Sequence, residues 1–215
     1  MGTELSTINL SQLPAVPEEK LQSSAPNYLQ RIQLVTKGKY VDTGKISPGH
    51  WGVPKGEDID DLGESIDILP ISVRDKALDL SDRENIISVY DVGSDEFKRI
   101  KAAPKNTGCM WGPSYLVLER KTQKLYEIFF GNPSGRAEAD KLLPFLPREG
   151  RDASVATLLI KYKQTKDYGW HVPVVVKCSE PIEGGPDMET ILGEIAKFNN
   201  PQTGPEKVED AQRAR

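Results

Sequence analysis

The chain has 215 residues, of which 37% are apolar and 28% are charged, and its formal net charge is −4. This length suits one sizeable core, and no run approaches the roughly 18 consecutive apolar residues that a membrane span requires. The N-terminus lacks the basic-then-apolar order of a secretory signal, and two cysteines are too few for a disulfide scaffold. We therefore expect a soluble, cytoplasmic protein with reduced thiols.

The net charge hides a strong segregation of charge along the chain. Residues 28–56 carry a net charge of +4 and residues 104–166 carry +5, whereas residues 57–67 hold six acids and no base. Residues 167–215 are acidic again, with a net charge of −4. A basic face between acidic flanks suits an anionic ligand, provided that the fold brings the two basic blocks together.

Composition divides the chain into one domain with two tails. Residues 1–27 hold three prolines and many Ser and Gln residues without a sustained period, which predicts a flexible arm. Residues 199–215 are polar and contain a Gly-Pro break, which predicts a C-terminal tail. The domain is expected over residues 28–198.

The first half of the domain reads as strands separated by loops. Residues 28–41 predict a strand region, and a long Gly/Pro-rich loop follows it. Residues 65–74 predict a second strand with a bulge or bend beside Pro70, because the alternation of apolar residues changes phase there. A short strand is expected over residues 85–90, and Ser94 is placed to cap a short helix that ends near Pro104.

The second half gives clearer patterns. Residues 115–120 and 124–130 predict a hairpin, and a short helix over 136–143 is expected to stop at Pro144. Residues 154–163 and 170–178 alternate as two strands, with Pro173 suggesting a sheet edge. Apolar residues from Met188 to Phe198 fall at helical spacing after Pro186-Asp187, which predicts a closing amphipathic helix.

The order strand, helix, strand, hairpin turn, strand over residues 124–178 matches the second half of an OB-type barrel. We therefore expect a mainly β (α+β) fold: an OB-like barrel with a short helix between strands and a C-terminal amphipathic helix. In that fold, the loop between the last two strands commonly contacts oligonucleotides. In this chain that loop lies at residues 164–169.

The chain also resembles phage-encoded proteins of the single-stranded-DNA-binding class. The resemblance rests on Pro48-Gly49-His50-Trp51-Gly52, on Arg74-Asp75-Lys76-Ala77-Leu78 and on Trp170-His171-Val172-Pro173. It covers the layout of residues 28–178 and implies action in phage DNA replication or recombination, in the host cytoplasm. The tail ends Ala211-Gln212-Arg213-Ala214-Arg215 instead of in an acidic, aromatic-tipped peptide, so the resemblance does not extend to recruitment of partners through such a tail.

Lysines interleave with aromatic rings at two predicted hairpins. Lysines neutralise phosphates and exposed rings stack on unpaired bases, so this combination favours a single-stranded nucleic-acid ligand over a plain run of charge. The first group surrounds the last hairpin and consists of Lys161, Lys163, Lys166, Tyr168 and Trp170. The second group surrounds the earlier hairpin and consists of Arg120, Lys121, Lys124 and Tyr126. The alternative for both groups is an ordinary solvated hairpin, with Tyr162 and Trp170 partly in the core.

Other chemistry has weaker support. The acidic stretch from Glu57 to Asp67 could hold Mg²⁺ as in a metal-dependent nuclease, but a solvated, repelling loop explains it more simply. The two histidines and two cysteines lack the close pairs that a zinc site needs.

The sequence therefore predicts a non-enzymatic single-stranded-DNA-binding protein without a metal or another cofactor and without a membrane partner. Self-association as a homo-oligomer is left open. The alternative is a protein-interaction or virion-associated β-domain that uses the same aromatic tip against a protein partner.

Overall fold

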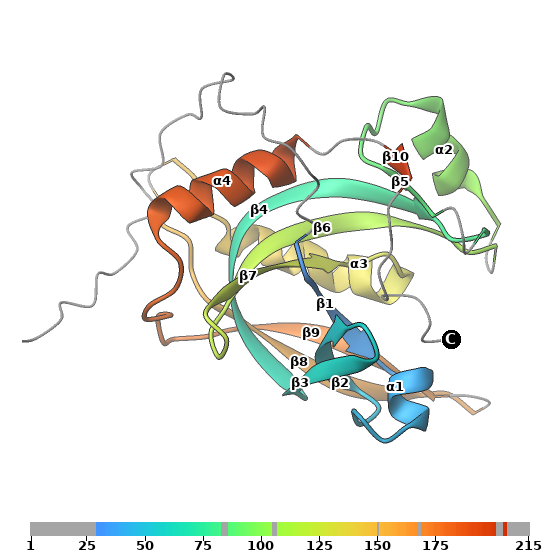
Figure 1. The fold of residues 1–215 in the computed structure, drawn as a ribbon, viewed down its shortest axis with the longest axis horizontal. Coiled ribbons are helices and arrows are strands. Elements are labelled where there is room, and N and C mark those ends of the chain that lie inside the picture. Colours follow the sequence, from blue (N-terminus) through green and yellow to red (C-terminus); the bar gives the residue numbers. More distant parts are fainter. Residues whose placement is uncertain are drawn as a thin grey trace, which may run out of the picture.

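The computed structural model describes residues 29–82, 86–104, 107–149, 151–166, 169–200 and 204–205, and it is mainly β (Figure 1). The predicted N-terminal arm, residues 1–27, and most of the predicted tail, residues 199–215, lie outside these residues. The strands are β1 (Arg31–Val35), β2 (His50–Lys55), β3 (Asp58–Gly63), β4 (Ser65–Asp79), β5 (Ile87–Val89), β6 (Cys109–Glu119), β7 (Lys124–Phe129), β8 (Ala156–Gln164), β9 (Gly169–Lys177) and β10 (Gly204–Pro205). The helices are α1 (Lys39–Asp42), α2 (Asp95–Ala102), α3 (Pro133–Ala139) and α4 (Met188–Asn199), with a 3₁₀ helix at Asp140–Phe145.

The strands form one curled sheet with the shape of a half-barrel (Figure 1). Its main path runs β10-β5-β4-β6-β7-β1-β2-β3, and β1 pairs with β7 in parallel while the other pairs are antiparallel. Strands β8 and β9 branch from this path, because β8 pairs with the beginning of β4.

The long strand β4 organises the sheet. Its first residues pair with β8 on one side, and most of its length pairs with β6 on the other. The register with β6 shifts between Pro70 and Ser72. Proline has no N–H for the ladder, so the strand bends here, which confirms the bulge that the sequence predicts. Because of this bend, β4 can pair with β8 at its beginning and with β6 along most of its length.

The concave side of the sheet holds the main hydrophobic core. Tyr115 and Val117 of β6 and Tyr126 and Ile128 of β7 alternate toward this side and are almost completely buried. The 3₁₀ helix adds Leu142 to the same core. Figure 1 shows α3 lying within the curve of the sheet. Because one face of β6 and β7 is buried in this core, apolar residues alternate along both strands, and this alternation is what predicts the hairpin.

The convex side is covered in part by α4 (Figure 1). Leu116 and Leu118 of β6 pack there against Ile191 and Phe198 of α4. Asp187 begins this helix by accepting a hydrogen bond from the Thr190 N–H at 2.8 Å, so the predicted amphipathic helix is confirmed. Helix α2 packs at the far end of the sheet, and Ser94 caps it as predicted by accepting from the Phe97 N–H.

Several element boundaries differ from the sequence predictions. The expected strand region over residues 28–41 holds a strand only in β1, and its end forms α1. The expected long loop after residue 41 contains β2, because Trp51 and Val53 pack into the concave core despite the glycine and proline around them. The expected acidic loop forms β3, which pairs with β2. Helix α3 begins earlier than predicted because Asn132 caps it, accepting from the Gly135 N–H, and Pro144 lies inside the 3₁₀ helix that follows instead of ending a helix.

No helix among the described residues is long and apolar enough to cross a membrane.

Candidate nucleic-acid interface

The last two long strands extend past the rest of the sheet as a two-stranded ribbon. Strand β8 pairs with β4 only over residues 156–159, whereas its pairing with β9 continues to Gln164 and Gly169. Within the described part of the chain, residues 160–164 and 169–173 therefore pair only with each other. Figure 1 shows the far end of the ribbon extending past α1. The predicted edge position of Pro173 is confirmed, because among the described strands β9 pairs only with β8.

The ribbon carries the first predicted group. Lys161, Lys163 and Lys166 are all exposed, as is every side chain from 161 to 166. Trp170 is half-buried and lies opposite Lys163 in the ladder. Tyr168, the fifth member of the group, lies outside the described residues. The described members thus place three ammonium groups and part of an indole ring on one projecting element.

Tyr162 adds an exposed ring to the same ribbon. It is 58% exposed and lies across the ladder from His171, with their ring centroids 5.1 Å apart. A Cβ atom on Gly169 would overlap its hydroxyl, and a Cβ on Gly49 would overlap the His171 ring. Tyr162 therefore covers a glycine of the neighbouring strand, while its outer face stays open to solvent.

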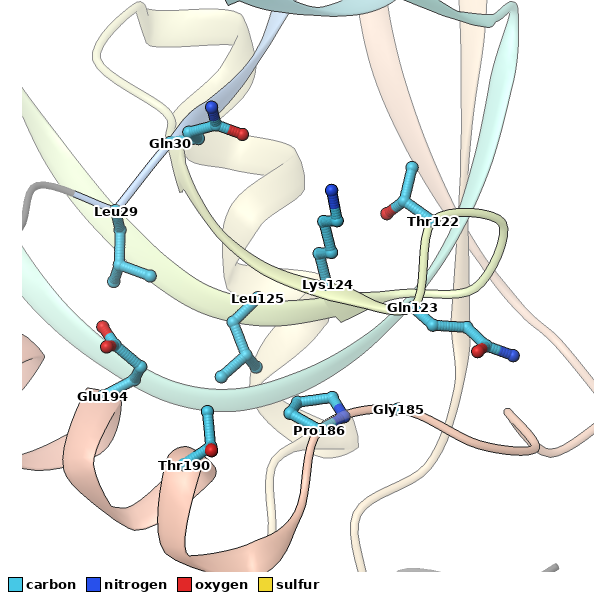
Figure 2. A pocket seen from close by; sticks show the side chains of 10 residues that line it. All are labelled: Leu29, Gln30, Thr122, Gln123, Lys124, Leu125, Gly185, Pro186, Thr190 and Glu194. Atoms are coloured by element: carbon cyan, nitrogen blue, oxygen red, sulfur yellow. The ribbon is translucent and has the colours of Figure 1, made fainter.

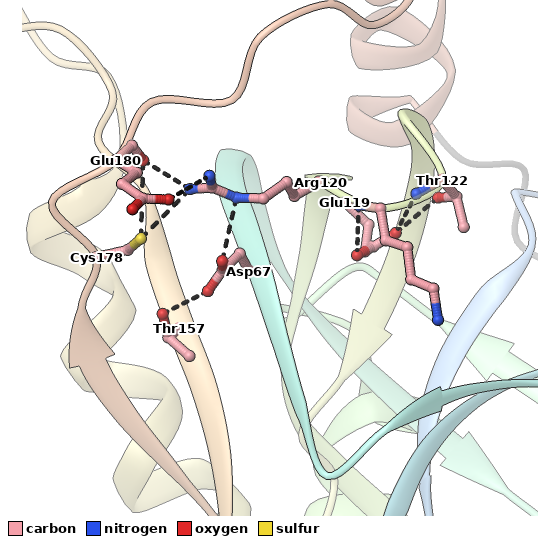
Figure 3. Close-up of polar contacts among 8 residues, drawn as sticks. Asp67, Glu119, Arg120, Thr122, Thr157, Cys178 and Glu180 are labelled. Atoms are coloured by element: carbon pink, nitrogen blue, oxygen red, sulfur yellow. Dashed lines mark hydrogen bonds and ion pairs between the residues drawn. The ribbon is translucent and has the colours of Figure 1, made fainter.

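The second predicted group behaves differently, and Arg120 is the clearest case (Figure 3). Its guanidinium lies 3.1 Å from the Asp67 carboxylate and 3.2 Å from the Glu180 carboxylate, and it donates to the Glu180 carbonyl at 2.7 Å. It also donates to the Cys178 sulfur at 3.3 Å. Asp67 in turn accepts a hydrogen bond from Thr157. Arg120 therefore joins β4, β8 and the segment after β9, and its two Nη groups donate inside the protein.

The hairpin beside Arg120 is held by Glu119, whose carboxylate accepts from the backbone N–H groups of Lys121 and Thr122 at 2.9 and 2.7 Å (Figure 3). The side chains of Lys121 and Lys124 are exposed. Tyr126 is 2% exposed and belongs to the concave core, so its ring is not available for stacking on a base. The alternation of β7 turns this side chain inward, and we withdraw Tyr126 from the interface.

The two predicted groups do not face one another. Arg120 lies beside Thr157 at the beginning of β8, whereas the ribbon tip begins at Gln164, seven residues further along the same strand. At the rise of a β-strand this separation is roughly 20 Å. The structure therefore does not join the groups into one groove, and the ribbon is the stronger candidate.

The acidic stretch is paired with cations instead of forming a free loop. Asp58 lies 2.6 Å from Lys45, and Asp60 forms an ion pair with Lys55. Asp61 accepts from His50 at 2.9 Å. The Lys45 ammonium, as the hydrogen-bond partner, holds the pKa of Asp58 below its usual value. In the part of the chain that the structure describes, no group of three or more His, Cys, Asp or Glu side chains is arranged to hold a metal ion.

The convex face contains a charged cluster that the sequence reading missed. Glu127 of β7 lies 2.9 Å from Arg31, 3.2 Å from Lys76 and 3.6 Å from Arg74, and it accepts from the Ser114 hydroxyl at 2.6 Å. Lys76 is completely buried and Glu127 is 4% exposed. We call Arg31, Arg74, Lys76 and Glu127 the convex cluster. Its partners are 51 and 96 residues apart in sequence, so no local pattern could have joined them.

Burial shifts the titration of this cluster. Desolvation lowers the pKa of Lys76 to about 7, and the neighbouring Arg31 and Arg74 add to the shift while Glu127 opposes it. Burial alone would raise the pKa of Glu127, but Lys76, Arg31, the Ser114 hydroxyl and Arg74 together hold it below its usual value. Glu127 is therefore ionised in the folded protein.

A groove of about 560 Å³ lies between the β6–β7 hairpin and α4 (Figure 2). Leu29 and Leu125 line one side, and Thr190 and Glu194 of α4 line the other. Lys124, from the second predicted group, stands at this groove. Leu29 is also the first described residue, so the groove lies where the N-terminal segment joins the domain.

Comparisons of the chain with protein-family models, with curated proteins and with solved structures find no significant match. The functional argument therefore rests on the geometry of this chain.

Proposed function

We propose that this protein binds single-stranded DNA without enzymatic activity, and that the β8–β9 ribbon is its principal contact. The observation that carries the proposal is the run of exposed side chains on an element that leaves the sheet. Lys161, Lys163 and Lys166 supply positive charge, and Tyr162 and Trp170 supply ring surface beside it. A role in phage replication or recombination remains part of this proposal.

An OB-type reading of the half-barrel supports the proposal. Strand β4 corresponds to the long first strand, which pairs with both the second strand and the fourth, here β6 and β8. Helix α3 falls between β7 and β8, where an OB barrel has a helix between its third and fourth strands. In this reading the ribbon is the connection between the last two strands, a region that contacts oligonucleotides in OB folds. The parallel pairing of β1 with β7 is an addition to that plan.

The chemistry of the ribbon suits an unpaired strand more than a duplex. Base stacking on an exposed ring contributes about 1–3 kcal/mol per base and tolerates any sequence, but it requires bases that are free of a partner. Each lysine that neutralises a phosphate of a single strand adds about 0.7 to the salt dependence of log K. Three lysines on the ribbon would give a slope of about 2 in magnitude.

Protein binding is the second candidate function. Exposed apolar side chains at the beginning of β8 and the end of β9 favour it. Leu159 and Val176 are each 36% exposed, and Val174 lies opposite Leu159 in the ladder. This small apolar surface at a sheet edge suits contact with a second copy of the chain or another protein.

Fluorescence anisotropy with labelled single- and double-stranded oligonucleotides at two salt concentrations tests the proposal. We expect the wild-type chain to prefer the single strand. Tyr162→Ala should weaken binding by about 1 kcal/mol or more, and Lys161→Ala combined with Lys163→Ala should lower the salt slope by about 1.4. Lys197→Ala, which removes a half-exposed lysine from α4, serves as the control for loss of charge.

The outcomes separate the function from the site. No single-strand binding at low salt would refute the proposed function, and concentration-dependent dimerisation in its place would favour the protein-binding alternative. If single-strand binding is unchanged in all the ribbon variants, the protein binds single-stranded DNA but the ribbon is not the contact site.

A further inference from the structure

The two faces of the ribbon carry different side chains. Tyr162 and His171 are direct partners in the β8–β9 ladder, so their side chains lie on one face of the ribbon, which we call the Tyr162 face. Lys161 and Lys163 are the neighbours of Tyr162 along β8, so the alternation of the strand turns them to the opposite face. These two lysines therefore do not flank a base that stacks on Tyr162, and the cation for its phosphates must come from another element.

The Tyr162 face packs against the loop between α1 and β2. The His171 ring covers Gly49 so closely that a Cβ atom on this glycine would lie 2.6 Å from a ring carbon. Gly49 has a φ of 87°, and its N–H donates to the Val35 carbonyl at 2.7 Å. Glycine suits the position because the ring is close and the φ is positive. Through this loop the ribbon is joined to the end of β1.

The end of β1 brings an exposed lysine to the same region. Lys37 follows Val35 by two residues, so its Cα lies within about 7 Å of the Val35 Cα. The Lys37 side chain is exposed, and no carboxylate of the described residues forms an ion pair with it. Lys45, which follows α1, lies by contrast 2.6 Å from the Asp58 carboxylate. Lys37 therefore keeps its ammonium available to an anion beside the Tyr162 face.

Acidic side chains bound this surface on its other side. His50, the residue after Gly49, lies 2.9 Å from Asp61 and 3.8 Å from Glu64, and Glu64 is 84% exposed. Strands β1 and β3 pair with opposite edges of β2, so Lys37 and Glu64 lie on either side of the first residues of β2. Negative charge repels a phosphate on the β3 side. A polyanion that reaches this surface would therefore run along the β1 side.

We propose that single-stranded DNA crosses from the Tyr162 ring to the turn between β1 and α1, where Lys37 binds one of its phosphates. This inference rests on the proposed function and extends its site beyond the ribbon. The contact of His171 with Gly49 brings together two basic blocks of the sequence, residues 28–56 and 104–166. A strand on this path meets a ring from one block and an ammonium from the other.

The path is short enough for one strand. The ring centroids of Tyr162 and His171 are 5.1 Å apart, and the His171 ring touches Gly49. The chain from Gly49 through Val35 to Lys37 spans roughly 12 Å between Cα atoms at most. A single OB fold covers about 4–16 nucleotides. One oligonucleotide can therefore contact Tyr162 and Lys37 at the same time.

Lys37→Met tests the inference in the full-length chain, with a labelled oligothymidine of about 16 nucleotides as the probe. We expect this variant to lower the salt slope of log K by about 0.7 and to weaken binding roughly three- to tenfold at low salt. Lys37→Arg keeps the charge and should keep the slope. Lys45→Met is the matched control, because it removes a lysine of the same basic block whose ammonium is already held by Asp58, and it should leave the slope unchanged.

The outcomes separate this contact from the proposed function. If Lys37→Met binds with the same salt slope as the wild type and Lys45→Met, the Lys37 contact is overturned and the ribbon site stands. A stoichiometry of two oligonucleotides per chain, or a lowered slope in Lys37→Met with wild-type binding by Tyr162→Ala, would overturn the single path. If the wild type binds no single-stranded DNA, the proposed function and this inference both fail. Urea unfolding checks that the variants are folded, and Lys37→Gln takes the place of Lys37→Met if that variant is not.

Discussion

Replacing Arg120 with Met separates a structural role of this residue from a binding role. Methionine keeps an unbranched apolar stem but removes all the donors that reach Asp67, Glu180 and Cys178. We expect Arg120→Met to lower the free energy of unfolding and to leave the affinity for single-stranded DNA unchanged, because the guanidinium is used inside the protein and lies far from the ribbon tip.

The magnitude follows from the contacts. Hydrogen bonds to charged groups contribute about 1.5–3 kcal/mol when they are shielded, and exposed ion pairs contribute about 0–1 kcal/mol. The side chains of Arg120 and Asp67 are 27% and 29% exposed, which places this pair between the two cases. The Glu180 carboxylate is mostly exposed and adds little, whereas the bond to its carbonyl ties down the segment after β9. We therefore expect a loss of about 2 kcal/mol.

Urea unfolding followed by circular dichroism measures this loss. With a slope of about 2 kcal/mol per molar urea, the midpoint should fall by about 1 M. Lys121→Met, a change at the exposed neighbouring residue, should alter the unfolding free energy by less than about 0.5 kcal/mol. An Arg120→Met protein with the wild-type midpoint and weakened DNA binding would refute our reasoning and return Arg120 to the interface.

Two further predictions concern stability. Asn132→Ala removes the side-chain cap that accepts from the Gly135 N–H at 2.6 Å, and it should cost about 1 kcal/mol in urea unfolding; an unchanged midpoint would show that the cap does not hold α3. The folded-state pKa of Lys76, about 7, is below its ordinary value of 10.5, so the unfolded chain binds more protons between these values and stability should rise with pH there, by at most about 1.4 kcal/mol per pH unit. Unfolding of wild type and Lys76→Met at pH 7, 8.5 and 10 measures this, and a difference between them that does not change with pH would contradict it.

Much of the fold was predictable because its signals are local. The alternating residues of the β6–β7 hairpin, the helix caps at Ser94 and Asp187, and the change of phase beside Pro70 all depend on neighbours within a few residues. The exposed lysines of the ribbon belong to the same class, because a charged strand end beyond the core stays in solvent. The prediction of a loop at residues 50–55 was wrong. Gly52 and Pro54 favour a loop locally, whereas Trp51 and Val53 pack into the core and form β2.

The sequence by itself determined a mainly β chain with a closing helix and an exposed basic tip, because period, caps and charge act over short distances along the chain. Only the tertiary structure decided which charged side chains lie close to one another. Pairing of distant strands assigned Arg120 to the interior network, turned Tyr126 into the core, and assembled Arg31, Lys76 and Glu127 from three strands. Such contacts depend on register between distant strands, which composition and periodicity do not specify.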